Sequence, residues 1–576
     1  MRTVITTCIL LLLMTLSFAS SANDTPRCWV FLRDPVFSPE QLQDALRKAE
    51  ADLTPRAAWR RSKVRSQGNL ADANDIPIPQ YYLDSISARG YEIVHVSKFL
   101  RAVSVRGKKS EVEPLTTLSF VRKVEPVAVS LSDPEVPANI DSQPEPQLPP
   151  SDRENLSLDW NPSDYGVAYN QLRRVNIPAA HDRGYAGQGI IVGVLDAGFA
   201  RMKRNYYGFT TPYHIVFDSL DILTCYDFVN NDSLVINQPL PDSGDGSHGT
   251  KTLSTVAGFA PGSYIGAAPR ASVILAKTEN TVVENQLEED HWVAGMEWAD
   301  SLGADIISSS LSYRAWYPYN LRDGDHAITT VAADLAAARG LLICNSSGNQ
   351  GASSVPWISC PADGDSVLTV GAVTADSIYA SFASRGPTYD GRIKPDLVAQ
   401  GSNVYCADAG STNQYTTASG TSLSTPIVAG ACAVVLSANP LLTPMELLDI
   451  LRSTATRATN PDTFVGWGIP DINRAVDTAL ARASACPPEG CIPLLLPEKH
   501  TLRAYPNPFN PTVTLYFEPA TFHRTIEVYD RLGRIVTILS VTPGVSTANF
   551  TPNSTTTGTY FLRFPNSPVV RATFLR

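Results

Sequence analysis

The sequence predicts an α/β chain in three folded parts: a small α+β unit, a doubly wound parallel sheet and a small C-terminal β-sandwich. Two Pro-rich stretches, at 131–160 and 484–499, divide the 576 residues. Between them, apolar strand-like runs alternate with helical stretches, whereas the segments after 500 show the alternation of half-buried strands. At about 150 residues per domain, a chain of this length is not expected to form one compact domain.

The first residues predict a secretory signal peptide over 1–22. Arg2 precedes an apolar run over 4–18, and small residues near Ala19 and Ala22 suit cleavage. A transmembrane anchor needs about 20 apolar residues, and this run is shorter. We expect the segment to be removed, and we expect no later segment to be long and apolar enough to span a bilayer.

Residues 23–130 are predicted to form the α+β unit. The stretch 40–53 is rich in helix formers, and 91–100 and 121–129 resemble strands. The acidic, Pro-rich residues 131–160 show no apolar periodicity, which indicates an exposed linker.

Residues 161–483 show the pattern of parallel β/α units, with helical stretches over 291–303 and 327–340. Their continuous apolar runs are typical of strands that are covered on both faces. These runs are 190–195, 271–277, 304–312, 341–345 and 366–373. Since such sheets hold their chemistry beyond the carboxyl ends of the strands, functional residues are expected there.

A second linker, 484–499, precedes the C-terminal part, 500–576. Val513, Leu515 and Phe517 alternate with polar neighbours there. This alternation is typical of half-buried strands and predicts a small β-sandwich.

Charge and cysteine content bound the class of protein. With 46 Lys+Arg and 56 Asp+Glu the formal net charge is −10, so nucleic acid is not an expected partner. Nine cysteines minus Cys8 of the signal peptide leave eight, which allow 105 disulfide pairings. Only Cys486 and Cys491 are close enough in sequence to suggest a local pair. The full set is Cys28, Cys225, Cys344, Cys360, Cys406, Cys432, Cys486 and Cys491.

Three reactive side chains stand at the ends of predicted elements. Asp196 follows a buried strand, His248 lies in GDGSHGT, and Ser422 opens the apolar helix of SGTSLSTPIVAG. Alone, each has an ordinary explanation: a turn residue, a loop histidine or a helix cap. Together they supply a nucleophile, a general base and a carboxylate that orients the base. We therefore predict Asp196, His248 and Ser422 as catalytic residues.

The same segments suggest where negative charge would be stabilised. A helix that begins at Ser422 directs backbone N–H groups at the reaction centre. NSSGNQG (345–351) offers the side chain of Asn349 as a further donor. Asn349 and Ser422 are therefore the predicted oxyanion hole.

These motifs resemble those of the subtilisin-like serine peptidases (subtilases, peptidase S8 family). VLDAGF, GSHGT, NSSGNQG and GTSLSTP match the aspartate, histidine, oxyanion-asparagine and serine motifs of the family, in the family's order. The resemblance implies a subtilisin-like doubly wound sheet and hydrolysis of peptide bonds through an acyl-enzyme on Ser422.

The resemblance also implies substrate-binding residues. SSSLS (308–312) looks like the family's edge strand, which pairs with the substrate backbone. The substrate-binding residues predicted from this segment and from NSSGNQG are Ser310, Leu311, Ser312, Ser347 and Gly348.

The sequence departs from the family pattern near the site. Ala197 follows the aspartate where Thr or Ser is usual, so one hydrogen bond to that carboxylate is expected to be absent. Ser312 ends the substrate segment where Gly is usual, and with Tyr313 after it the adjoining subsite is expected to be narrower. Ser359 and Cys360 approach the floor of the family's specificity pocket. These differences leave the cleavage-site preference open.

The two flanking parts resemble accessory domains. Residues 23–130 resemble the pro-region of these enzymes, an inhibitor and folding aid, although an inert small domain is the alternative. Residues 500–576 resemble the type A sorting domain of the type IX secretion system, an Ig-like β-sandwich, through AYPNPFNP (504–511), TIEVYDRLGRIV (525–536) and GTYFLRF (558–564). An accessory Ig-like domain without a sorting role stays open.

We therefore expect a secreted or cell-surface serine endopeptidase, made as a zymogen, that acts on polypeptides. Its expected partners are its own pro-region and the outer-membrane secretion machinery. No cofactor is expected for catalysis, no metal ligands are predicted, and structural calcium, common in the family, cannot be assigned to residues. The alternatives are a catalytically silent peptide-binding module and a surface adhesin. The pro-region cleavage point and the oligomeric state stay open.

Overall fold

The computed structural model describes two compact units, Met1–Ala485 and Cys486–Arg576, which we treat separately. The described residues are 26–66, 68–127, 160–202, 213–236, 246–279, 289–314, 317–484 and strand segments between 503 and 574. The predicted signal peptide, nearly all of both predicted linkers, Cys486 and Cys491 lie outside the described residues. The predicted domain boundaries therefore stay predictions.

The N-terminal part of the first unit is a four-stranded antiparallel sheet, in the order β2-β3-β1-β4, with helices packed on it. Helix α1 begins at a capping box in which Ser38 and Gln41 exchange side-chain to backbone hydrogen bonds. The elements are β1 (Arg27–Leu32), α1 (Pro39–Ala51), α2 (Pro55–Ser62), α3 (Gln80–Ser87), β2 (Ile93–Ser97), β3 (Ala102–Arg106), α4 (Lys109–Val112) and β4 (Val121–Pro126).

The central sheet has seven strands in the order β13-β12-β11-β10-β5-β9-β6, and all of its neighbouring strands are parallel. The predicted α/β class with a parallel sheet is confirmed. The strands are β5 (Ile191–Asp196), β6 (Asp221–Asp227), β9 (Ser272–Lys277), β10 (Ile306–Ser309), β11 (Leu342–Ser346), β12 (Val367–Val373) and β13 (Leu397–Gln400). Sequence reasoning did not identify β6 and β13, because neither contains a long apolar run.

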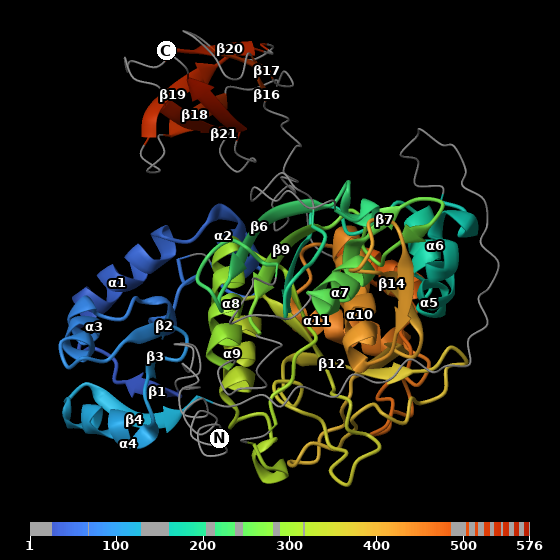
Figure 1. The fold of residues 1–576 in the computed structure, drawn as a ribbon, viewed down its shortest axis with the longest axis horizontal. Helices are drawn as coiled ribbons and strands as arrows, with labels where there is room; N and C mark the ends of the chain where they lie inside the picture. The colour runs from blue at the N-terminus through green and yellow to red at the C-terminus, as the bar shows by residue number, and fades with distance from the viewer. Residues whose placement is uncertain are drawn as a thin grey trace, which may run out of the picture. The chain divides into compact units, whose positions relative to one another are not determined.

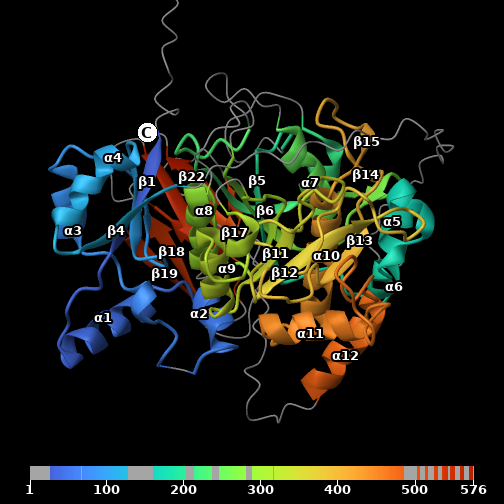
Figure 2. The same ribbon diagram turned by 90° about the horizontal axis from the view of Figure 1, so that it is seen from below.

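Helices cover both faces of this sheet (Figure 1 and Figure 2). Side chains alternate along β5: Val192 and Val194 join the core that includes α7 and α10, whereas Leu195 joins the core that includes α8 and α9. The helices are α5 (Tyr169–Arg174), α6 (Ile177–Asp182), α7 (Ser247–Ala257), α8 (Glu289–Leu302), α9 (Ile328–Ala337), α10 (Thr421–Ala438), α11 (Pro444–Thr454) and α12 (Ile472–Ser484). Short antiparallel pairs are β7 (Phe259–Ala260) with β8 (Tyr264–Ile265), and β14 (Val404–Ala407) with β15 (Tyr415–Ala418).

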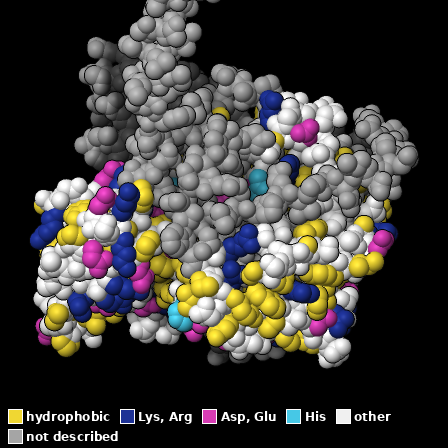
Figure 3. Space-filling view, turned by 60° about the horizontal axis from the view of Figure 1, so that its bottom comes forward, with side chains coloured by type: hydrophobic (Ala, Val, Ile, Leu, Met, Phe, Trp, Pro, Cys, Tyr) yellow, Lys and Arg dark blue, Asp and Glu magenta, His cyan; other side chains and the backbone are white. Residues whose placement is uncertain are grey.

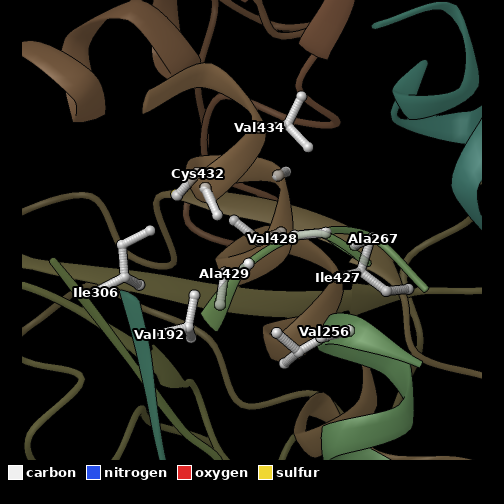
Figure 4. Packing of buried hydrophobic residues seen from close by; sticks show 14 of the residues in the cluster. Val192, Val256, Ala267, Ile306, Ile427, Val428, Ala429, Cys432 and Val434 are labelled. Atoms are coloured by element: carbon white, nitrogen blue, oxygen red, sulfur yellow. The ribbon is translucent and has the colours of Figure 1, made fainter. Parts of the chain in front are cut away.

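Helix α10 is the central core helix. Its residues Ile427, Val428 and Ala429 pack among Val192, Val256 and their neighbours (Figure 4). By length and composition α10 could span a membrane, so the expectation that no later segment would pass that test was wrong. Since 83% of its 18 residues are buried inside the protein, the apolar composition reflects packing on all sides of the helix.

The second unit contains two antiparallel sheets, ordered β16-β17-β20 and β19-β18-β21-β22. Leu515 of the predicted alternating segment is buried, as are Ile526 and Val528. The strands are β16 (Arg503–Tyr505), β17 (Val513–Tyr516), β18 (Arg524–Tyr529), β19 (Ile535–Val541), β20 (Thr547–Phe550), β21 (Gly558–Arg563) and β22 (Val570–Phe574). Most of AYPNPFNP and residues 530–534 lie outside the described residues.

The protein surface carries charges of both signs. Figure 3 shows Lys and Arg side chains interspersed with Asp and Glu side chains on one face of the molecule. This mixture agrees with the modest net charge of −10.

Candidate active site

The predicted catalytic residues come from three elements of the first unit. Asp196 is the last residue of β5, His248 is the second residue of α7, and Ser422 is the second residue of α10. Asn349 lies in the loop after β11, which ends at Ser346. Each of these residues therefore lies at or just after the end of a strand, or in the first turn of a helix. At such places the regular backbone hydrogen bonding ends, and a side chain can reach neighbouring elements.

Asp196 and His248 are hydrogen-bonded to each other. The distance from His248 Nδ1 to Asp196 Oδ1 is 2.6 Å. The Asp196 side chain is 1% exposed and that of His248 is 28% exposed. Because the carboxylate accepts a hydrogen bond from Nδ1–H, the hydrogen of a neutral ring stays on Nδ1. Nε2 then carries no hydrogen and can accept a proton.

The environment raises the pKa of His248 above its ordinary value. Burial lowers this pKa, but the charge of Asp196 and its hydrogen bond raise it, and together with the charge of Glu279 they outweigh burial. The pair is therefore arranged to stabilise an imidazolium once the ring has taken a proton.

Ser422 lies beside Ser310. Ser422 Oγ donates to the Ser310 carbonyl at 3.4 Å, and Ser310 Oγ donates to the Ser422 carbonyl at 2.9 Å. Within the described part of the chain, the Ser422 hydroxyl has no hydrogen bond to His248. Hydrogen bonds between nucleophile and base are often looser without substrate.

Asn349 is anchored next to Ser422. Its Oδ1 accepts hydrogen bonds from the Thr421 N–H at 2.9 Å and from Thr421 Oγ1 at 3.0 Å. Because the carbonyl end of the carboxamide binds Thr421, the NH₂ end is the donor that Asn349 can direct elsewhere. The first turn of α10 also has backbone N–H groups without partners within the helix.

The predicted substrate segment lies differently from the expectation. Residues 306–309 form β10, which pairs with both β5 and β11, so Ser308 and Ser309 belong to a central strand and not to an edge strand. Only Ser310, Leu311 and Ser312, which follow the strand, can offer an edge. The expectation failed because a run of small polar residues does not reveal which neighbours a strand has.

The other predicted substrate-binding residues lie close by. Ser347 Oγ donates to the Ser384 carbonyl at 3.0 Å, and Gly348 adopts φ +100°, a conformation that glycine favours. Both the N–H and the carbonyl of Tyr313 bond to Cys360, at 2.8 and 3.1 Å. The Ser359 N–H also donates to the Ser347 carbonyl at 3.3 Å, so the segments around 312, 347 and 359 are held together. The role of these residues in binding stays a prediction.

Sequence reasoning missed one residue that contacts the site. The hydroxyl of Thr252 donates to Asp196 Oδ2 at 2.8 Å. Thr252 lies four residues after His248 on α7, so it shares a helix face with it. That spacing was the signal that could have identified it.

The described residues contain no group of three or more His, Cys, Asp or Glu side chains placed to hold a metal ion. Calcium therefore stays unassigned.

Three family models match successive parts of the chain. The subtilase family matches residues 187–468, the peptidase S8 propeptide domain of Bacteroidota matches 27–143, and the secretion system C-terminal sorting domain matches 503–570. The first match includes the segments that carry Asp196, His248, Asn349 and Ser422, and the third includes the strands from β16 to β21.

Curated relatives show the same similarity. The chain is 30% identical to subtilisin E of Bacillus subtilis strain 168, over 54% of this chain and 70% of that protein. It is 32% identical to subtilisin BL of Lederbergia lenta, over 50% of this chain and 90% of that protein. It is 30% identical to serine protease AprX of B. subtilis strain 168, where the match spans 46% of this chain and 61% of the relative.

Replacement of Asp196 by Asn should lower the pKa of His248. The change removes the charge that raises this pKa and leaves the burial that lowers it. The ring titration, followed by NMR in both proteins, measures the shift, and the exposed His326, paired with Asp323, is the internal control. An unchanged His248 pKa would contradict the electrostatic role given to Asp196.

Proposed function

The chain belongs to the subtilase family of serine proteases, and on that basis we propose that Asp196, His248 and Ser422 are the catalytic triad of a secreted endopeptidase. The observation that carries this assignment is the 2.6 Å hydrogen bond between the buried Asp196 carboxylate and His248 Nδ1. Charge and geometry together prepare the opposite ring nitrogen to act as a base.

The proposed reaction follows from these roles. His248 Nε2 takes the proton of Ser422 while Oγ attacks the scissile carbonyl carbon, and Asp196 stabilises the resulting imidazolium. The imidazolium then gives its proton to the leaving amine as the C–N bond breaks, which leaves an acyl-enzyme on Ser422. A water molecule then attacks the ester carbon while His248 takes its proton. The bond between this carbon and Ser422 Oγ breaks, His248 returns the proton to Oγ, and the acid product leaves.

The proposed oxyanion hole consists of Asn349 Nδ2 and the N–H of Ser422. The anchoring of Asn349 Oδ1 by Thr421 supports this role, because it holds the carboxamide in one orientation before the charge develops. Donors that are oriented in advance need no reorganisation in the transition state.

Substrate binding is proposed along Ser310, Leu311 and Ser312, with Ser347 and Gly348 opposite. An extended peptide would pair with the backbone where the chain leaves the central sheet. The Ser310 carbonyl accepts a hydrogen bond from the Ser422 hydroxyl, so a peptide bound along this segment would have its scissile bond within reach of Ser422.

A catalytically silent peptide-binding module is the alternative. One observation favours it: the described Ser422 hydroxyl bonds to Ser310 and not to His248. The complete set of Asp196, His248, Asn349 and Ser422 favours the enzyme.

The Ser422→Ala variant should have no peptidase activity and an intact fold, because Ser422 supplies the only oxygen proposed to form the acyl-enzyme. Hydrolysis of unfolded casein measures activity, and circular dichroism checks the fold. Ser437→Ala is the matched control, since Ser437 lies on the same helix and its hydroxyl bonds to the Val434 carbonyl of that helix. A Ser422→Ala protein with wild-type turnover would refute the assignment.

The propeptide domain is proposed to inhibit the enzyme by docking on α8. Arg60 and Arg61 of α2 both pair with Asp300 of α8, and all three side chains are fully buried. Burial raises the pKa of Asp300, but the two arginine charges lower it by more, so the carboxylate stays ionised.

Further contacts extend this docking surface. Arg27 pairs with Asp290 at 2.7 Å, both buried, and Trp29 Nε1 donates to Glu289 Oε1 at 3.2 Å. Apolar contacts join the two parts as well, because Trp29 belongs to the same core cluster as α8. Removal of one partner from a buried ion pair typically costs about 3–5 kcal/mol. Each pair should therefore contribute strongly to the specificity with which the propeptide domain binds α8.

Residues 23–130, added as a separate chain, should therefore inhibit the mature enzyme. Arg60→Gln should weaken inhibition by about a hundredfold or more, because it leaves Asp300 with one partner fewer in a buried site. The inhibition constant is the measurement, and Arg47→Gln is the control, since the Arg47 side chain is 79% exposed. No inhibition by the wild-type segment at micromolar excess would favour an inert domain.

The C-terminal sorting domain indicates export to the cell surface or medium. We propose that it binds the type IX outer-membrane machinery, that residues 1–22 direct the first export step, and that the domain is an Ig-like sandwich. Two antiparallel sheets of three and four strands support the sandwich.

Deletion of 500–576 should leave the catalytic constants of the purified protease nearly unchanged, because every proposed catalytic residue precedes the deleted segment. In the native cell, the truncated protein should stop in the periplasm. Fractionation of cells that carry the full-length and truncated forms distinguishes the outcomes. Equal amounts of both forms outside the cell would eliminate the sorting role.

A further inference from the structure

The two oxygens of the Asp196 carboxylate have different partners. Oδ1 accepts from His248 Nδ1 at 2.6 Å and from the Ala197 N–H at 2.8 Å. Oδ2 accepts from Thr252 Oγ1 at 2.8 Å, and among the described residues Thr252 is its one hydrogen-bond donor. A buried carboxylate oxygen without a donor is strongly unfavourable, so the Thr252 hydroxyl satisfies a real requirement.

The hydroxyl of Thr252 has a choice of acceptors. It lies 2.8 Å from Asp196 Oδ2 and 3.1 Å from the Gly249 carbonyl, and one O–H can donate fully to only one of them. The carboxylate is closer and charged, and hydrogen bonds to charged acceptors are the stronger ones. The hydroxyl therefore points its hydrogen at Asp196.

The location of this hydroxyl is linked to Ala197. The subtilases resembled by this sequence usually carry Thr or Ser directly after the aspartate, where Ala197 has no hydroxyl to offer. Thr252 lies instead on α7, one turn after His248, and its side chain is buried. One helix thus carries both the base and a hydroxyl that holds the carboxylate which orients the base.

We propose that Thr252 is a positioning residue of the active site: its hydroxyl fixes Asp196 in the orientation that His248 needs, and it replaces the hydroxyl absent at position 197. The proposal rests on the proposed function of Asp196 and His248. Without this donor, the carboxylate can turn to seek another partner, and the imidazole loses its fixed tautomer and direction. The effect falls on the chemical step, because Thr252 has no described contact with the substrate segment.

Thr252→Val keeps the shape of the side chain and removes the hydroxyl. The variant is made in the full-length chain and assayed after maturation. We expect its kcat to be about tenfold or more below that of the wild type with KM unchanged, which is the pattern of a lost transition-state interaction. Thr252→Ser keeps a hydroxyl and should retain most of kcat. Thr454→Val is the matched control, because among the described residues the buried Thr454 hydroxyl bonds to carbonyls of its own helix, those of Ile450 and Leu451.

A second substitution in Thr252→Val tests whether a hydroxyl at position 197 can take the place of the Thr252 hydroxyl. Addition of Ala197→Ser should recover part of kcat, whereas a double variant as slow as Thr252→Val would refute this replacement. Wild-type kcat in Thr252→Val, or equal losses in Thr252→Ser and Thr252→Val, would overturn the positioning role. These results differ from failure of the proposed function, in which the wild-type protein itself would show no turnover or Ser422→Ala would retain it.

Discussion

The buried carboxylate of Asp196 is the group around which the proposed active site is organised. A charge in an interior of low dielectric is tolerated only when donors surround it, and here His248, Thr252 and the Ala197 N–H supply them at 2.6–2.8 Å. The parallel sheet provides the location, since β5 ends at Asp196 within reach of α7. Helix α10, packed on the same face of the sheet as α7, brings Ser422 and, through Thr421, Asn349 to the same region.

The propeptide domain is held by the same physics on the opposite face. Its arginines are buried against carboxylates of α8, so the docked state depends on complete pairing of charges that neither part could leave unpaired in an apolar interface. Helix α8 therefore has two roles: its apolar side covers the central sheet and its carboxylates bind the propeptide. This arrangement links the fold of the protease to its propeptide domain through one helix.

Local patterns in the sequence predicted the parts that depend on local chemistry. Apolar runs identified β5, β9, β11 and β12, because strands covered on both faces need them. The small-residue motifs predicted the roles of Asp196, His248 and Ser422, and the structure joins the first two by a hydrogen bond. Features that depend on which residues become neighbours in the folded chain could not be predicted from these local patterns. The central place of β10 and the pairing of Arg60 with Asp300, 240 residues later, are properties of the folded chain. Thr252 was missed because a helical threonine is ordinary until the partner of its hydroxyl is known.

The proposed mechanism requires that His248, held by Asp196, activates Ser422. The most direct test is the pH dependence of covalent labelling of the mature protein by a fluorophosphonate, with the modified residue identified by peptide mass mapping. We expect an adduct on Ser422 whose rate of formation rises with pH through the pKa that NMR gives for His248. An adduct on another residue, or a rate whose inflection does not follow the titration of His248, would contradict it.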